Sequence, residues 1–352
     1  MNQKIKRIVL GLVAITLITV LCGPSVRAEK QETGNRQKRA SNGKKKTWLV
    51  DNVEHVDLYP EPGSSAPAGF KRNALVFRKP GAKATVLICH GFMCSKTDVR
   101  FLHYLFKQFH VVFFDFRAHG DDPEGQTCTF GLDESYDVRA AVDFIRKDPE
   151  LSRVPLVSYA FSMGAVASIH AQSRYKNLFD CAIWDCPFES TEGLLLRIID
   201  RLEVQVYGYA FQIPGRAFLK KYAYNSYVQS FLKKALKAIA QVDSSLVETR
   251  MTPINTVKAA EGVSIPTLLI TCVNDLKAPP AAVQKIFDAL QGSKILRVTG
   301  GRGHFDSFFS DPQSYELWMG QFIEQFLSGT FNAEKPVRLI EEILAKGGVG
   351  DE

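Results

Sequence analysis

Short continuous apolar runs alternate with amphipathic stretches over much of this chain. Continuous runs suit parallel strands that are buried on both faces, whereas apolar residues three and four apart favour helices. Strands are expected at residues 53–58, 74–77, 85–89, 111–116, 154–157, 180–184, 266–272 and 294–298, and helices at 96–109, 134–147, 165–171, 281–290 and 315–327. This alternation predicts an α/β fold whose mostly parallel sheet is covered by helices on both sides.

The alternation breaks between residues 188 and 265, where the pattern is mainly helical. One apolar stripe at helical spacing there consists of Val228, Phe231, Leu232, Ala235, Leu236 and Ile239. We therefore expect a core of residues 47–187 and 266–330, with residues 188–265 inserted as a helical cap over the sheet edge that carries the active site. Residues 331–352 add a short amphipathic helix and a tail.

Residues 1–28 have the pattern of an export signal. Lys4, Lys6 and Arg7 precede an uncharged apolar run at 8–22, and Val26-Arg27-Ala28 supplies the small or apolar residues of a cleavage site. We expect an exported protein, periplasmic or secreted. The apolar run is shorter than the roughly 20 residues of a membrane-spanning helix, so an uncleaved membrane anchor is the alternative.

Most of the net charge of +7 lies before residue 47. Removal of residues 1–28 leaves +3, and the next segment, 29–46, is itself rich in lysine and arginine, so that the rest of the chain carries −2. The basic pI therefore gives no support for a nucleic-acid partner. Segment 29–46 is expected to be a flexible linker, and the N-terminal segment offers at most an association with a membrane surface.

Six cysteines follow the export signal: Cys89, Cys94, Cys128, Cys181, Cys186 and Cys272. Three of them lie inside apolar strand-like runs, where cysteine usually acts as a small core residue. Cys94 and Cys128 fall in expected loops and are the pair that an oxidising compartment would allow to form a disulfide. No Cys/His spacing typical of a zinc site occurs, so we expect no metal.

Ser162 lies where an expected strand turns directly into an expected helix. The surrounding sequence, Ala160-Phe161-Ser162-Met163-Gly164, fits the G-x-S-x-G pattern of a nucleophile elbow, with alanine in the first small position. Residues two before and two after the serine must be small because strand and helix approach closely there. A surface serine in an ordinary strand-to-helix turn is the alternative interpretation.

A serine hydroxyl becomes a good nucleophile when a base accepts its proton, and the base is oriented by an acid. Of the two histidines after Ser162, His170 lies within the expected helix, whereas His304 lies in a glycine-rich loop after a strand. Asp275 follows the strand at 266–272 and is the expected acid, with Asp185 as the fallback. The predicted catalytic residues are therefore Ser162, Asp275 and His304.

The oxyanion of an acyl-transfer reaction needs hydrogen-bond donors on the far side of the carbonyl. We expect the backbone N–H of Met163, next to the nucleophile, and that of Phe92, in the loop after the strand at 85–89, to supply them. The side chains of Phe92 and Phe161 are expected to line the substrate pocket. His90 and His119 are interpreted as structural.

These motifs resemble those of the α/β-hydrolase superfamily over residues 70–328. The resemblance is strongest to its serine-aminopeptidase-like, monoacylglycerol-lipase-like and dienelactone-hydrolase-like branch. The matching segments are Cys89-His90-Gly91-Phe92, Asp115-Phe116-Arg117-Ala118-His119-Gly120, Phe161-Ser162-Met163-Gly164-Ala165, Trp184-Asp185-Cys186-Pro187-Phe188, Asn274-Asp275 with Ala278-Pro279, and Gly303-His304. The resemblance implies a sheet of about eight strands, a helical lid, a serine nucleophile and no cofactor. Ala118 and Ala160 stand where the family usually has glycine, and Cys272-Val273-Asn274 replaces a common glycine before the acid.

We therefore expect a serine hydrolase of the carboxylesterase or lipase type that forms an acyl-enzyme on Ser162. Its substrate would be a small-molecule or lipid-like ester, or alternatively a thioester or short amide. The apolar insertion favours a hydrophobic substrate. Two other functions fit the same residues: an acyltransferase, in which an alcohol or amine replaces water, and a hydrolase-like binding protein whose triad is idle.

Overall fold

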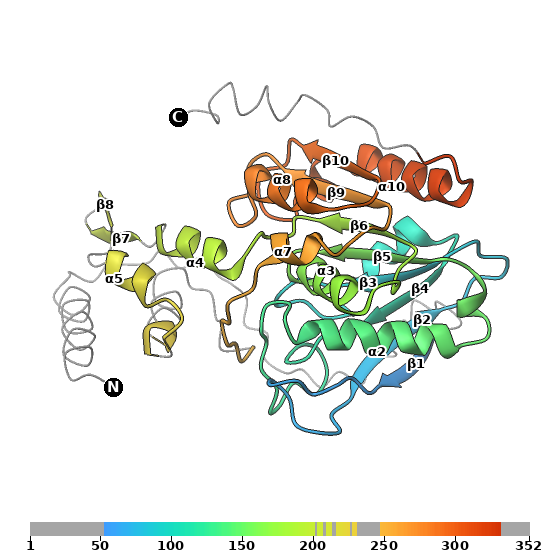
Figure 1. Cartoon of the computed structure of the whole chain (residues 1–352), viewed down its shortest axis with the longest axis horizontal. Coiled ribbons are helices and arrows are strands. Elements are labelled where there is room, and N and C mark those ends of the chain that lie inside the picture. The colour runs from blue at the N-terminus through green and yellow to red at the C-terminus, as the bar shows by residue number, and fades with distance from the viewer. Residues whose placement is uncertain are drawn as a thin grey trace, which may run out of the picture.

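The computed structural model describes residues 53–200, 203–206, 209–212, 216–225, 227–230 and 247–331, with the backbone alone for 203–206 and 209–212. The expected export signal, the linker and nearly all of the C-terminal segment lie outside these ranges, so their assignments stay predictions from sequence. Figure 1 shows the described elements along the chain. Among these elements, no helix is both long enough and apolar enough to cross a membrane.

One sheet organises the molecule. Its strands are β1 (Val53–Leu58), β2 (Arg72–Phe77), β3 (Thr85–Cys89), β4 (His110–Phe114), β5 (Leu156–Phe161), β6 (Cys181–Asp185), β9 (Thr267–Cys272) and β10 (Lys294–Thr299). They are arranged in the order β1-β2-β4-β3-β5-β6-β9-β10. β2 runs antiparallel to β1 and β4, and every pair from β4 to β10 is parallel. The predicted mostly parallel α/β sheet is confirmed.

The central strands are buried along their whole length, as their continuous apolar sequences predict. Every residue of β3, β4, β5, β6 and β9 is buried. The edge strand β1 has mostly exposed or half-buried positions. Because parallel strands point the same way, the loops that follow β3, β5, β6, β9 and β10 meet at one edge of the sheet.

Helices pack on the sheet in two groups. α2 (Glu134–Lys147), α3 (Met163–Tyr175), α7 (Thr256–Ala260) and α8 (Pro280–Ala289) pack in series, each against the next (Figure 1). The second group packs on Tyr159 of β5. The Tyr159 ring lies 5.2 Å from that of Phe106, in the 3-10 helix η1 (Arg100–Phe106), and its hydroxyl lies 2.9 Å from that of Tyr315, in α10 (Pro312–Leu327).

η1 is shorter and more tightly wound than the helix predicted at 96–109. The backbone N–H of Lys96 donates to Asp115 Oδ1 at 2.7 Å, which holds the segment before η1 in a turn. A 3-10 helix has three residues per turn, so positions three apart share a face. Leu102 and Leu105 are accordingly buried, whereas Phe101 and Tyr104 are 43% and 60% exposed.

In its described residues, the insertion at 188–265 contains a β-hairpin beside the predicted helices. It contains α4 (Thr191–Asp200) and α5 (Arg216–Lys221), but β7 (Glu203–Val206) and β8 (Tyr209–Gln212) form an antiparallel hairpin between them. Figure 1 shows α4 leading away from the sheet, with α5, β7 and β8 beyond it. A small apolar cluster, separate from the main core, joins its helices: Leu195, Ile199, Leu219, Ala223 and Val228. The rest of the stripe predicted for 228–239 lies outside the described residues.

Candidate active site

Ser162 occupies a strained turn between the end of β5 and the start of α3. Its φ of 52° and ψ of −124° lie in a region that residues other than glycine rarely adopt. The Ser162 N–H donates to the carbonyl of Asp185, at an N···O distance of 2.9 Å. The end of β6 therefore fixes the turn that presents the serine at the sheet edge.

Close packing explains why one small position of the elbow is glycine and the other alanine. A Cβ on Gly164 would lie 2.3 Å from the Cys89 carbonyl oxygen and 2.5 Å from that of His90, so no side chain fits. Ala160 is buried in β5, where it pairs in register with Cys89 of β3 and Trp184 of β6. A methyl group is accommodated within that sheet, and the elbow keeps its geometry.

His304 connects the serine to an acid. Its Nε2 lies 2.7 Å from Ser162 Oγ, and its Nδ1 lies 2.8 Å from Asp275 Oδ2. Asp275 is 1% exposed, and the side chain of His304 is 18% exposed. The structure thus brings together the three side chains that the sequence selects, in the order needed for removal of the serine proton.

The loop after β9 holds Asp275 in place despite its unusual sequence. Asp275 Oδ1 accepts hydrogen bonds from the backbone N–H groups of Lys277 and Ala278, at 2.8 and 2.9 Å. Asn274 Nδ2 donates to the carbonyl of Gly301 at 3.1 Å, which ties this loop to the one that carries His304. The replacement of a glycine by Cys272-Val273-Asn274 therefore leaves the acid aimed at the imidazole.

Both predicted oxyanion donors border the serine. A Cβ on Gly91 would lie 3.5 Å from Ser162 Cβ and 2.8 Å from the Phe161 ring, so the loop that carries Phe92 passes directly beside the nucleophile. Met163 is the first residue of α3, and the N–H groups of a first helical turn have no acceptor within the helix. These positions fit donors aimed at a substrate carbonyl.

Backbone strain is concentrated around Ser162. Met93, Cys186 and Phe305 have φ values of 63°, 45° and 58°. They lie in the loop after β3, just after β6, and next to His304. Residues held in sparsely populated conformations cluster at functional sites because the surrounding structure over-determines them. Ala118 also has a positive φ, 59°, which accounts for the glycine usual at that position.

The sequence pattern of the Alpha/beta hydrolase family matches residues 86–315. This chain belongs to that family. A curated relative, the uncharacterized protein YqkD of Bacillus subtilis (strain 168), is 23% identical over 250 residues, which make up 70% of this chain and 73% of the relative.

Solved structures share the fold of this alpha/beta hydrolase. The esterase Pf2001 of Pyrococcus furiosus aligns with a TM-score of 0.57 and 21% identity, over 78% of this chain and 93% of the esterase. The alpha/beta hydrolase GrgF of Penicillium sp. sh18 aligns with a TM-score of 0.54 and 16% identity, over 79% of this chain and 99% of its own. These structures establish a common fold, and the family match supports a hydrolase.

The contacts of the other histidines near Ser162 indicate a structural role in this alpha/beta hydrolase. His90 Nε2 accepts from the Phe116 N–H at 3.1 Å, and its Nδ1 lies 2.8 Å from the Gly91 carbonyl oxygen. Burial lowers the pKa of His90 and of His119, which keeps both imidazoles neutral. His170 lies in α3, and burial lowers its pKa to about 4. None of the three is hydrogen-bonded to Ser162.

Sequence reasoning missed a set of buried charges beneath the loop that follows β4. Lys96 pairs with Asp115 and Asp121, and Arg117 pairs with Asp137. Arg72 of β2 donates to four backbone carbonyls of the loop, those of Asp115, His119, Asp121 and Asp122. Charged residues normally lie at the surface, so a single sequence gives no sign that these are buried in pairs.

Asp185, the fallback acid, has a different partner. It is fully buried at the end of β6, and the Tyr315 hydroxyl donates to its Oδ2 at 2.9 Å. Burial raises the pKa of the Asp185 carboxyl to about 7; the hydrogen bond from Tyr315 opposes this increase, and the charge of Asp275 adds to it. The carboxylate that accepts the hydrogen bond from His304 is that of Asp275 and not that of Asp185.

The cysteines of the described part of the chain are all free, so Cys94 and Cys128 form no disulfide. Cys186 lies close enough to Asp275 and His304 for one ligand atom of each to fall within 4.8 Å of the others. However, both imidazole nitrogens are occupied by Ser162 and Asp275, and burial raises the pKa of the Cys186 thiol. This donor set fits a hydrogen-bonded triad better than a metal site.

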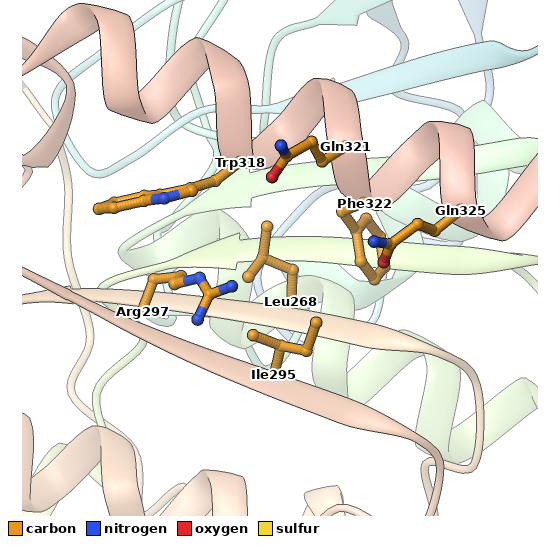
Figure 2. Close-up of a pocket in the computed structure, with 7 residues that line it drawn as sticks. All are labelled: Leu268, Ile295, Arg297, Trp318, Gln321, Phe322 and Gln325. Carbon is orange, nitrogen blue, oxygen red and sulfur yellow. The ribbon is translucent and has the colours of Figure 1, made fainter. Parts of the chain in front are cut away.

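A small cavity lies between α10 and the strands β9 and β10 (Figure 2). Leu268, Ile295 and Phe322 form its apolar wall, and Arg297 lies 6.0 Å from the Trp318 ring beside it. Its volume of about 20 Å³ is enough for roughly one water molecule. It includes no residue of the predicted triad, and it is too small for an ester substrate.

Proposed function

We propose that this alpha/beta hydrolase is a serine esterase that cleaves carboxylic esters through an acyl-enzyme on Ser162. The hydrogen-bonded series from Ser162 Oγ through His304 to Asp275, with distances of 2.7 and 2.8 Å, is the observation that carries this proposal. An idle binding protein would need neither an aligned imidazole nor a strained serine, so these features favour an enzyme.

In the proposed mechanism, His304 Nε2 accepts the hydroxyl proton while Ser162 Oγ attacks the carbonyl carbon of the ester. His304 Nδ1–H donates to Asp275 Oδ2, which keeps the imidazole in the required tautomer and stabilises the imidazolium. The backbone N–H groups of Phe92 and Met163 bind the oxyanion. The imidazolium then protonates the leaving alcohol, and water repeats the sequence to release the acid.

Labelling with a fluorophosphonate probe tests the nucleophile. We expect the wild type to be labelled and Ser162→Ala to be unlabelled. Ser328→Ala, which changes an exposed serine at the end of α10, should label like the wild type. Labelling that does not depend on Ser162 would overturn the assignment of the nucleophile.

The substrate is proposed to be hydrophobic. Phe161 directly precedes the serine, Phe92 follows Gly91 in the loop beside it, and the Phe92 ring lies 5.0 Å from that of Phe130. A series of p-nitrophenyl esters of increasing chain length measures this preference. We expect kcat/KM to rise from acetate to longer acyl chains, and the absence of any preference beyond acetate would count against a hydrophobic substrate.

A further inference from the structure

Four phenylalanine rings form a continuous row from the catalytic edge of the sheet to the surface. Phe161 stacks on Phe305, with ring centroids 3.8 Å apart. Phe305 meets Phe309 edge to face at 6.4 Å, and Phe309 lies 5.9 Å from Phe101. We call these four residues the aromatic row. Phe161 directly precedes Ser162 and Phe305 directly follows His304, so the inner end of the row adjoins the triad.

The outer end of the row is exposed. Phe161 is 3% exposed, whereas Phe101 and Phe309 are 43% and 57% exposed. These residues come from β5, from η1 and from the segment that runs from the His304 loop into α9 (Ser307–Ser310), so three separate segments contribute to the row. An aromatic surface assembled from several segments and left in water is typical of a binding site for an apolar partner.

The charged groups beside the row are engaged elsewhere in the protein. The Arg100 guanidinium lies 5.3 Å from the centroid of the Phe77 ring, which is not part of the row. Its neighbour Phe101 instead packs near Phe308 and Phe309. Asp306, between Phe305 and Phe309, accepts a hydrogen bond from the Arg302 N–H at 2.6 Å. The row therefore presents ring faces and edges, which suit an alkyl chain better than a charged or polar ligand.

We propose that the aromatic row binds the alkyl chain of the ester substrate, and that Phe101 and Phe309 determine the preferred chain length. This inference rests on the proposed esterase function and names its substrate class. A short acyl group would stay near Ser162, whereas a longer chain would extend along Phe305 to the two outer rings. Each added methylene that leaves water gains about 0.8 kcal/mol, so the outer rings should matter only for long chains.

The test compares p-nitrophenyl acetate with p-nitrophenyl octanoate in the wild type, in F101A/F309A and in Y59A. Tyr59 is 71% exposed and lies outside the row, so Y59A is the matched control for loss of an exposed aromatic ring. In F101A/F309A we expect the octanoate-to-acetate ratio of kcat/KM to fall about tenfold. In Y59A the ratio should equal that of the wild type. An unchanged ratio in F101A/F309A would overturn the proposal.

A binding measurement separates failure of this proposal from failure of the esterase function. Isothermal titration calorimetry with decanoic acid should show affinity for the wild type and an affinity about tenfold weaker for F101A/F309A. Equal affinities would overturn the role of the row even in an active esterase. If the wild type neither reacts with the fluorophosphonate nor hydrolyses any ester, the esterase function fails, and the calorimetry still decides whether the row binds alkyl chains.

Discussion

Two buried carboxyls lie at the ends of neighbouring strands, yet their surroundings give them different chemistry. Asp275 accepts hydrogen bonds from two backbone N–H groups and from the imidazole of His304. Asp185 receives a tyrosine hydroxyl inside the core, and burial favours its neutral form. Because Asp275 contacts His304 and Asp185 contacts Tyr315 in the core, we expect substitution of Asp275 to affect activity and substitution of Asp185 to affect stability.

We expect Asp275→Asn to lower kcat for ester hydrolysis by about four orders of magnitude, because an amide there leaves His304 in the wrong tautomer. Asp185→Asn, the matched control at the next strand end, should stay within about tenfold of the wild type, because Asp185 does not contact His304. The measurement is kcat with p-nitrophenyl butyrate. Equal losses in the two variants would contradict the assignment of the acid.

Asp185→Asn should also change how stability depends on pH. A carboxyl whose pKa is near 7 when folded and near its ordinary value when unfolded binds a proton more tightly in the folded state. Its contribution to the free energy of unfolding is therefore present at low pH and is lost as the pH rises through 7. Between pH 5 and pH 8 this loss is about 2–3 kcal/mol.

Urea unfolding at pH 5 and pH 8 measures this effect. Asparagine can still accept the Tyr315 hydrogen bond but does not titrate, so the fall in unfolding free energy from pH 5 to pH 8 should be smaller in D185N than in the wild type. Parallel pH dependence in the two proteins would show that Asp185 is ionised throughout.

The catalytic residues could be selected from the sequence for two reasons. The reaction requires particular residue types, and each of these residues follows the end of a strand. Ser162 and Asp275 follow buried apolar strands, His304 follows the partly buried strand β10, and such runs are visible in a single sequence. The positive φ of Cys186 and Phe305 was not predictable, because it comes from contacts between loops that are distant in the sequence. Likewise, the hydrogen-bond partner of Asp185 is a tyrosine 130 positions away.

At the scale of elements, the loop after β4 is held by one buried carboxylate. Asp115 accepts from the Lys96 backbone N–H, the Lys96 ammonium and the Asp121 N–H. A Cβ on Gly120, whose φ is 65°, would lie 2.1 Å from the Asp115 carboxyl carbon. The absence of a side chain at Gly120 therefore allows the loop to fold back closely over the Asp115 carboxylate.

Gly120→Ala should lower the free energy of unfolding by about 3 kcal/mol or more, because it combines backbone strain with displacement of Asp115. Gly125→Ala is the matched control. Gly125 lies in the same loop with a φ of 69°, but an added Cβ would meet nothing within 4 Å. It should cost only about 1 kcal/mol. Urea unfolding measures the loss of unfolding free energy in each variant. Equal losses would mean that backbone strain alone accounts for the loss in Gly120→Ala, without displacement of Asp115.

Helices and strands were predictable where a single periodicity of apolar residues, helical or strand-like, dominates the sequence. The boundaries of β1, β3 and α2 match the sequence prediction, and α2 buries the apolar residues Val138, Ala141, Val142 and Ile145 on one face. The hairpin of β7 and β8 was missed because its strands are four residues each within a generally apolar segment. The alternation in Glu203-Val204-Gln205-Val206 is a strand signal that a reading of overall hydrophobicity overlooks. The turn before η1, which a hydrogen bond from the Lys96 N–H to Asp115 holds, was also not predicted, because the two residues are distant in the sequence.

At the scale of the whole molecule, stability does not depend on disulfides among the described residues. We expect the midpoint of thermal unfolding to be the same with and without dithiothreitol. In the folded protein, Ellman's reagent should modify Cys94, which is half-buried, and leave the five buried cysteines intact until the protein unfolds. Cys94→Ser should remove this reactivity, apart from any due to Cys22. A drop in the midpoint with reductant would contradict this expectation.

The fold of the whole chain was predictable because it follows from the order of buried strands and helices, and the family pattern over residues 86–315 agrees with it. The arrangement of the insertion was not predictable. Its helices α4 and α5 share a small apolar cluster of their own, whereas α7 packs on α3 and α8 of the core. The sequence pattern does not show whether an apolar helical face meets the core or another part of the insertion.

Arg72 lies on β2, a strand that contributes no residue to the triad. Its guanidinium nevertheless binds four carbonyls of the loop after β4, which surrounds Asp115 and lies next to the loop of His90. The family pattern begins only at residue 86. A fragment cut at that boundary would contain the serine, the acid and the base but would lack the donor that shapes this loop. The smallest self-sufficient unit of this hydrolase therefore begins at or before β2.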